Sequence, residues 1–193
     1  MTRSKTISKA LLLMFAVALA GSALAQDVVH AVAGAVTHID KAGKTIAIKG
    51  ADGSEQTFKF TERTAIRTSV EAEKGVKPGA LDTYFAGKEG TKVVVRYMGK
   101  GADKTATVVE DFGKESLKAG KGTVTHVDRA ARTVSVKTDS GAEETYKLGS
   151  EAVVETDHGV VRGSRYLAKE GDKVAVHYTE EEGAKVVRFF QKL

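Results

Sequence analysis

Apolar and polar side chains alternate with a period of two residues along short segments of the chain. In residues 45–49, for example, Ile46 and Ile48 are separated by Ala47 and flanked by Thr45 and Lys49. This period, in runs rich in β-branched and aromatic residues, is typical of strands that bury one face. The same alternation recurs at residues 58–60, 93–97, 133–137, 146–148 and 174–178. The pattern predicts an all-β fold.

The strand pattern occurs twice in the chain. Residues 34–60 align without a gap on residues 122–148, with twelve identities in 27 positions. A second match pairs the segment that begins at Tyr84 with the one that begins at Tyr166, and the first copy has about seven extra residues before it. Because an internal repeat of this kind marks a repeated structural unit, we expect two related modules.

Turn residues separate the predicted strands of each copy. Gly53 and Gly141 lie in short polar segments between the second and third strands, where glycine favours a tight hairpin. Fourth strands are predicted after Gly90 and Gly171, and fifth strands at 105–109 and 185–190. A short helix is predicted over 68–74, in the first copy alone. Five antiparallel strands with a helix after the third are the order of an OB-type barrel, whose closure removes exposed edges.

These elements define the expected organisation of the chain. We place the first barrel at residues 27–110, a linker at 111–121 and the second barrel at 122–193. Modules this small bury only about 60–65% of their unfolded surface, so we expect them to pack together. Phe189 and Phe190 must point to opposite sides of the last strand. One is expected inside its own barrel and the other against the neighbouring module.

Three short patterns occur in both copies: Gly-x-Val-Thr-x-[Ile/Val]-Asp, Thr-[Ile/Val]-x-[Ile/Val]-Lys and Glu-Gly-x-Lys-Val. They span most of residues 34–193, and on them the chain resembles the small OB-like barrel modules of exported bacterial proteins. That family has no agreed active site, so the resemblance implies a fold and no site residues. The periplasmic copper-binding small barrel is similar in shape and uses a His, Met and Trp set. This sequence has no Trp, and Met98 is its only methionine after residue 25.

The N-terminal segment has the order of a secretory signal. Arg3, Lys5 and Lys9 precede an apolar run over 10–20, and small residues follow up to Ala25. We expect cleavage after Ala25, since the run is too short to span a membrane stably. The signal peptide is thus residues 1–25, and the product is expected to be periplasmic or secreted, without stable insertion in the membrane.

Composition excludes several classes of function. Cleavage removes three positive charges and no negative ones, which lowers the formal net charge from +5 to +2, so a nucleic-acid binder is not expected. The absence of cysteine excludes disulfides and thiolate chemistry. The sequence has no nucleophile elbow, HExxH helix, P-loop or dinucleotide fingerprint. We therefore expect a protein that is not an enzyme and has no cofactor.

His38 and His126 occupy equivalent positions in the two copies, each two residues before an aspartate. On a regular strand the two side chains would share a face and offer one nitrogen and one oxygen ligand per module, so both histidines are candidate metal ligands. In the alternative interpretation, Asp40 and Asp128 cap the loops at 40–44 and 128–132. The spacing of the apolar residues Val36 and Ile39 indicates a bulge near His38. The other histidines, His30, His158 and His177, are expected on the surface or in loops.

Three hypotheses for function follow. The first is an accessory or binding protein of the bacterial cell envelope, whose partner is an envelope protein or a small ligand. It predicts an apolar groove or exposed aromatic patch around Tyr84, Phe85 and Tyr166. The second is a periplasmic metal carrier that uses the histidines of the first strands. The third is a purely structural tandem without a ligand.

Overall fold

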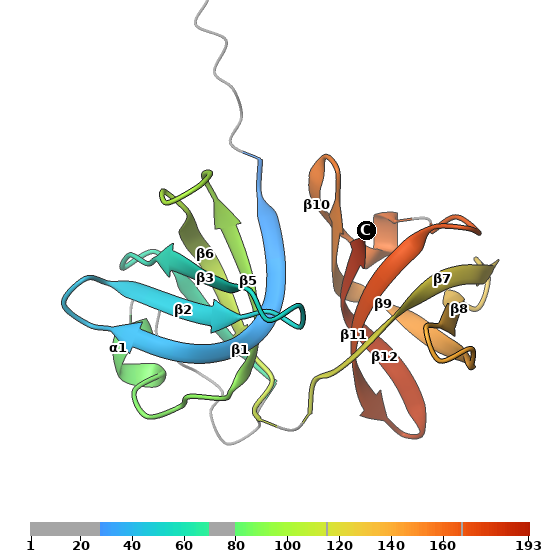
Figure 1. Cartoon of the computed structure of the whole chain (residues 1–193), viewed down its shortest axis with the longest axis horizontal. Coiled ribbons are helices and arrows are strands. Elements are labelled where there is room, and N and C mark those ends of the chain that lie inside the picture. The colour runs from blue at the N-terminus through green and yellow to red at the C-terminus, as the bar shows by residue number, and fades with distance from the viewer. Residues whose placement is uncertain (1–27, 70–79, 115, 167) are drawn as a thin grey trace, which may run out of the picture.

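The computed structural model describes residues 28–69, 80–114, 116–166 and 168–193. Within these residues the chain is all-β, as the alternation predicts, with one short α-helix and one 3-10 turn. Figure 1 shows two β-units side by side. The first unit comprises residues up to 114, and the second begins at 116. The predicted signal peptide at 1–25 lies outside the described residues. In the described part of the chain, no helix is long and apolar enough to cross a membrane.

The first unit is a closed barrel of five strands with one additional strand at its edge. Its hydrogen-bonded order is β3-β2-β1-β5-β6-β4, and β6 also pairs with β3, which closes the ring. The elements are β1 (His30–Asp40), β2 (Thr45–Lys49), β3 (Glu55–Lys59), β4 (Ala65–Thr68), α1 (Leu81–Tyr84), β5 (Lys92–Met98) and β6 (Thr105–Asp111).

The second unit has a six-stranded sheet in the order β10-β9-β12-β11-β7-β8. Its long strand β9 pairs with β12 and also with β8, the last strand in this order. The elements are β7 (Lys118–Asp128), β8 (Thr133–Thr138), β9 (Glu143–Thr156), β10 (Gly159–Arg162), the 3-10 turn η2 (Gly163–Arg165), β11 (Lys173–Glu181) and β12 (Ala184–Lys192).

Each unit has a sixth strand that the sequence did not predict, β4 in the first and β10 in the second, and three further details differ. The strands are not all antiparallel, because β6 runs parallel to β3 and β4, and β12 runs parallel to β9. The connection between the units is shorter than the predicted linker 111–121, because Asp111 pairs within β6 and residues 118–121 pair within β7. The predicted helix at 68–74 begins in β4, and its residues from 70 on lie outside the described part.

The His-x-Asp segments form the same local structure in both units. The β1–β2 register shifts between Val36 and His38, and the β7–β8 register shifts between Val124 and His126, which confirms the expected bulge. The Oδ1 atom of Asp128 accepts hydrogen bonds of 2.9 Å from the N–H groups of Ala130 and Ala131. Asp40 makes the same pair of contacts in the first unit. Both aspartates therefore cap the turn that follows.

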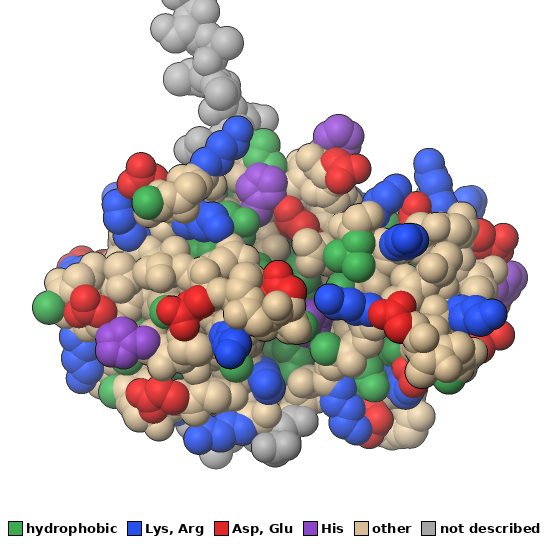
Figure 2. Space-filling model, viewed as in Figure 1, with side chains coloured by type: hydrophobic (Ala, Val, Ile, Leu, Met, Phe, Trp, Pro, Cys, Tyr) green, Lys and Arg blue, Asp and Glu red, His purple; other side chains and the backbone are tan. Residues whose placement is uncertain are grey.

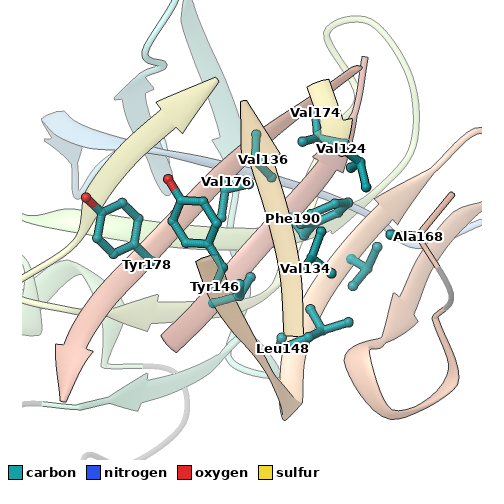
Figure 3. Close-up of a cluster of buried hydrophobic side chains, with 13 residues drawn as sticks. Val124, Val134, Val136, Tyr146, Leu148, Ala168, Val174, Val176, Tyr178 and Phe190 are labelled. Carbon is teal, nitrogen blue, oxygen red and sulfur yellow. The ribbon is translucent and has the colours of Figure 1, made fainter. Parts of the chain in front are cut away.

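Each unit has its own hydrophobic core, and a third cluster lies between the units. Figure 3 shows the core of the second unit, with Tyr146 and Tyr178 on one side and Ala168 on the other. The third cluster, called the seam below, contains Ala31, Ala33, Val94 and Phe112 of the first unit and Leu117, Val153 and Phe189 of the second. Phe190 is in the core and Phe189 in the seam, so the prediction for this pair is confirmed.

Polar contacts flank the seam. Glu155 of β9 accepts hydrogen bonds from the His30 side chain at 2.7 Å and from the backbone N–H of Ala31 at 2.8 Å. The N–H of Val160 donates to the carbonyl of Val29 at 2.7 Å, which joins β10 to the residues before β1. Because all three bonds connect the two units, they fix how the apolar surfaces meet.

His177 packs against Phe189 of the seam, which corrects its expected surface position. It is 9% exposed, and its ring lies 5.6 Å from that of Phe189. Loss of hydration on burial, together with the positive charges of Lys121 and Lys92, lowers the pKa of His177 to about 4. The imidazole is therefore neutral at pH 7.

Acidification is expected to weaken the fold through His177. Its folded pKa lies below the value near 6.5 of an unfolded chain, so the unfolded state binds the proton first and stability falls between about pH 6.5 and pH 4. We expect the free energy of unfolding to fall by roughly 3 kcal/mol less in His177→Leu than in the wild type between pH 7 and pH 4. Denaturant unfolding at the two pH values measures this difference. His158→Leu, at an exposed turn position, is the control. Equal acid sensitivity of the wild type and His177→Leu would contradict the assignment.

Candidate functional site

A cavity of about 270 Å³ opens at one end of the second unit. It lies where β7 turns into β8, beside η2. The lining residues are Val127, Asp128, Arg129, Arg132, Thr133, Val134, Leu148, Gly163, Ser164, Tyr166 and Ala168. In Figure 3, Val134, Leu148 and Ala168 lie on the side of the core away from Tyr178. The cavity is therefore an extension of the hydrophobic core to the surface.

The apolar side chains that line the cavity are smaller than those at the equivalent positions of the first unit. In the gap-free alignment of the copies, Val127 and Val134 replace Ile39 and Ile46, and Leu148 replaces Phe60. All three replacements remove carbon atoms at the same end of the core. The space in the second unit is therefore encoded by side-chain size.

The segment that covers this end also differs between the units. In the first unit α1 places Leu81 and Phe85 in the core, and both side chains are fully buried. In the second unit the shorter η2 takes the place of α1, and Gly163 lies three residues before Tyr166 as Leu81 lies three before Tyr84. A Cβ atom at Gly163 would lie 2.4 Å from the carbonyl oxygen of Gly149. No side chain fits at that position, so Gly163 itself contributes none to the cover of this end.

Two arginines stand at the mouth of the cavity. Arg129 and Arg132 are exposed and belong to the turn between β7 and β8. Neither forms an ion pair within the described ranges, whereas Arg188 pairs with Glu181 and Arg162 lies 3.9 Å from Glu151. The mouth therefore carries two unneutralised guanidinium groups.

Tyr166 forms part of the wall and contributes a polar group. Its ring is half-buried and packs 5.4 Å from the ring of Phe190. Burial raises the pKa of Tyr166, with a smaller contribution from Asp172. The phenol therefore stays protonated at neutral pH. Together with the hydroxyls of Thr133 and Ser164, it gives an apolar pocket a few neutral hydrogen-bonding groups.

The corresponding end of the first unit has a surface hollow of different character. It is lined by Lys44, Phe60, Thr61, Glu62 and Arg63, with a volume of about 460 Å³. Phe60 is the one apolar residue in this set, which also contains one acidic and two basic residues. This hollow is larger than the cavity of the second unit, but it is more open to solvent and only one apolar side chain among the described residues lines it. We regard the second unit as the better ligand site for that reason.

The candidate metal ligands lie on the surface of separate units. His38 and His126 are both exposed at their bulges. The Nδ1 atom of His126 lies 3.4 Å from a carboxylate oxygen of Glu170. Among the residues that the structure describes, no group of three or more His, Cys, Asp or Glu side chains is placed to hold a metal. Asp40 and Asp128, the expected oxygen ligands, instead accept backbone hydrogen bonds in their turns.

The three aromatic residues that were expected to form an exposed patch differ in burial. The prediction of an exposed patch is wrong for Phe85, which is fully buried, and Tyr84 is half-buried with its hydroxyl donating to Asp111 at 2.7 Å. Tyr166 does line the cavity. Sequence reasoning missed Arg129 and Arg132. A comparison of residue sizes between the two copies is the signal that would have located the cavity.

We found no protein-family model that matches the chain and no similar curated protein. Among solved structures, a copper(II)-bound variant of CusF from Escherichia coli is similar, with a TM-score of 0.32 and 13% identity over 40% of this chain and 92% of that one. Silver(I)-bound CusF has a TM-score of 0.32 and 12% identity over 40% of this chain and 97% of that one.

Exchanging one wall residue between the units is expected to change stability in opposite directions. Leu148→Phe places the residue of the first unit in the cavity and is expected to stabilise the fold by about 0.5–2 kcal/mol, since it fills empty space. Phe60→Leu is expected to destabilise it by about 1–2 kcal/mol, because it removes buried carbon atoms from the core. Denaturant unfolding measures both. A destabilising Leu148→Phe substitution would argue against open space at this position.

The metal hypothesis for His38 and His126 stays a prediction that calorimetry tests. Isolated, exposed histidines are expected to bind Cu²⁺, Zn²⁺ or Ni²⁺ no more tightly than ~100 μM at neutral pH. Tighter binding that disappears in His38→Ala or His126→Ala, and survives in His158→Ala, would instead establish a metal site.

Proposed function

We propose that this chain is an exported, non-enzymatic binding protein built of two related OB-like barrels, and that the second barrel binds a small ligand. The observation that carries the proposal is the cavity of about 270 Å³ at the end of the second barrel. Its apolar wall and few polar groups are what small-molecule sites in proteins share. The ligand's apolar part lies against Val134, Leu148 and Ala168.

The size of the cavity supports a ligand of modest affinity. Its volume is just below the range of about 300–1,000 Å³ that is usual for ligand pockets. A body of about ten non-hydrogen atoms fits such a space. At about 0.4–0.7 kcal/mol per atom, in the lower part of the range for small ligands, ten atoms correspond to dissociation constants of roughly 10 μM to 1 mM.

The N-terminal pattern and the chemistry of the lining support the remaining parts of the proposal. Residues 1–25 have the order of a cleavable signal, which favours the periplasm or secretion. The described residues that line the cavity include Ser164 but no histidine to act as a base for its hydroxyl. A ligand that is bound and released unchanged is the function that fits these residues. An envelope protein that receives this ligand would be the partner.

Restoring the first barrel's residues in the cavity is expected to abolish binding. We propose to titrate the full chain with small aromatic probes, benzyl alcohol, benzoate and indole, by calorimetry and ligand-observed NMR. The double variant Val134→Ile with Leu148→Phe should weaken binding at least tenfold, because it fills the space that the ligand occupies. Leu148→Met, which keeps the side-chain volume, should remain within about threefold of the wild type.

Two results would overturn the proposal. One is that no probe binds the wild-type chain at millimolar concentration. The other is that the cavity-filling variant binds as well as the wild type while it remains folded by circular dichroism.

A further inference from the structure

We infer that the ligand of the second barrel carries an anionic group, a carboxylate or a phosphate, which Arg129 and Arg132 bind at the mouth of the cavity. This inference rests on the proposed function and specifies its ligand. The ligand is then a small amphipathic anion, with its apolar body inside and its charged end at the surface.

The first observation is a paired replacement of lysine by arginine. The first unit has Lys41 and Lys44 in the turn where the second has Arg129 and Arg132. The formal charge is unchanged, but the chemistry is not. A guanidinium offers a planar fork of N–H donors that matches two oxygens of a carboxylate or phosphate, whereas an ammonium is a hydrated point charge. The change coincides with the smaller apolar wall, so both differences occur at the same end of the same unit.

The second observation is that the turn between the arginines is held in one conformation. The two hydrogen bonds to Asp128 fix its first residues, and Arg132 has a backbone φ of 57°, in the left-handed region. Because the turn is constrained at both ends, the backbone positions of Arg129 and Arg132 relative to each other are restricted. Less conformational entropy is then lost when both guanidinium groups bind one anion.

The local balance of charge also favours an anion. Asp128 is the one acidic residue in the lining, and its Oδ1 is already bonded to two backbone N–H groups. The lining therefore contains two guanidinium groups and one carboxylate. Asp172 and Asp157 also act on Tyr166, and the carboxylate of Asp172 is paired with Lys192 at 2.9 Å. The hydroxyls of Thr133, Ser164 and Tyr166 add neutral donors that an anion can use.

Calorimetry on the full chain at low ionic strength tests the inference with matched probes. Benzoate and phenyl phosphate share an aromatic body with benzyl alcohol and differ in charge. We expect both anions to bind at least tenfold more tightly than the alcohol. Arg132→Gln and Arg129→Gln should each weaken anion binding about tenfold and leave benzyl alcohol unchanged. Arg132→Lys should retain the charge but lose the planar pair of N–H donors, so its affinity for the anions should fall several fold.

Control variants come from the other unit of the same chain. Lys41→Gln and Lys44→Gln remove equivalent charges from the first unit, so they should leave every affinity within twofold of the wild type. Inorganic phosphate should bind far more weakly than phenyl phosphate, because it lacks the apolar body.

The outcomes separate the inference from the function on which it rests. If benzyl alcohol and benzoate bind equally and the arginine variants leave both affinities unchanged, the inference of an anionic ligand is wrong. The cavity then remains a ligand site. If inorganic phosphate binds as well as phenyl phosphate, the arginines act without the cavity and the inference is also wrong. If no aromatic probe binds, the proposed function itself fails.

Discussion

A small β-barrel must cover the open ends of its core, and the two halves of this chain meet that constraint differently. In the first, Leu81 of α1 and the adjacent Phe85 are fully buried in the core. In the described part of the second, η2 begins with Gly163, which has no side chain, at the place where α1 begins with Leu81. Because the residues around this end are also smaller, a cavity results. The units therefore differ in the segment that covers this end of the core and in the size of the side chains around it.

The seam between the units leaves this end of the second unit available. It uses Phe189, Val153 and the residues before β7, whereas the cavity lies at the β7–β8 turn. Figure 2 shows acidic and basic side chains interspersed over both units, on the face seen there. A mixed surface of this kind leaves charge-based recognition to local groups, such as the two arginines at the cavity mouth.

Much of the architecture could be predicted from period-two alternation, because burial of one face dictates it. The bulge at His38 followed from Val36 and Ile39, and the opposite placement of Phe189 and Phe190 followed from the pleat. The parallel closing pair of β12 and β9 did not follow, since alternation does not encode which strands meet. The cavity was missed for a related reason. It depends on the combined sizes of Val134, Leu148 and Gly163, which only the fold brings together.

Methyl NMR during a titration with benzoate tests the central claim most directly, because the two units serve as internal controls for each other. The account predicts chemical-shift changes at the methyl groups of Val127, Val134 and Leu148, which line the cavity. It predicts none at Ile39, Ile46 and Leu81, which occupy the filled end of the first unit. Shifts that are equal in the two units, or confined to the first, would contradict it.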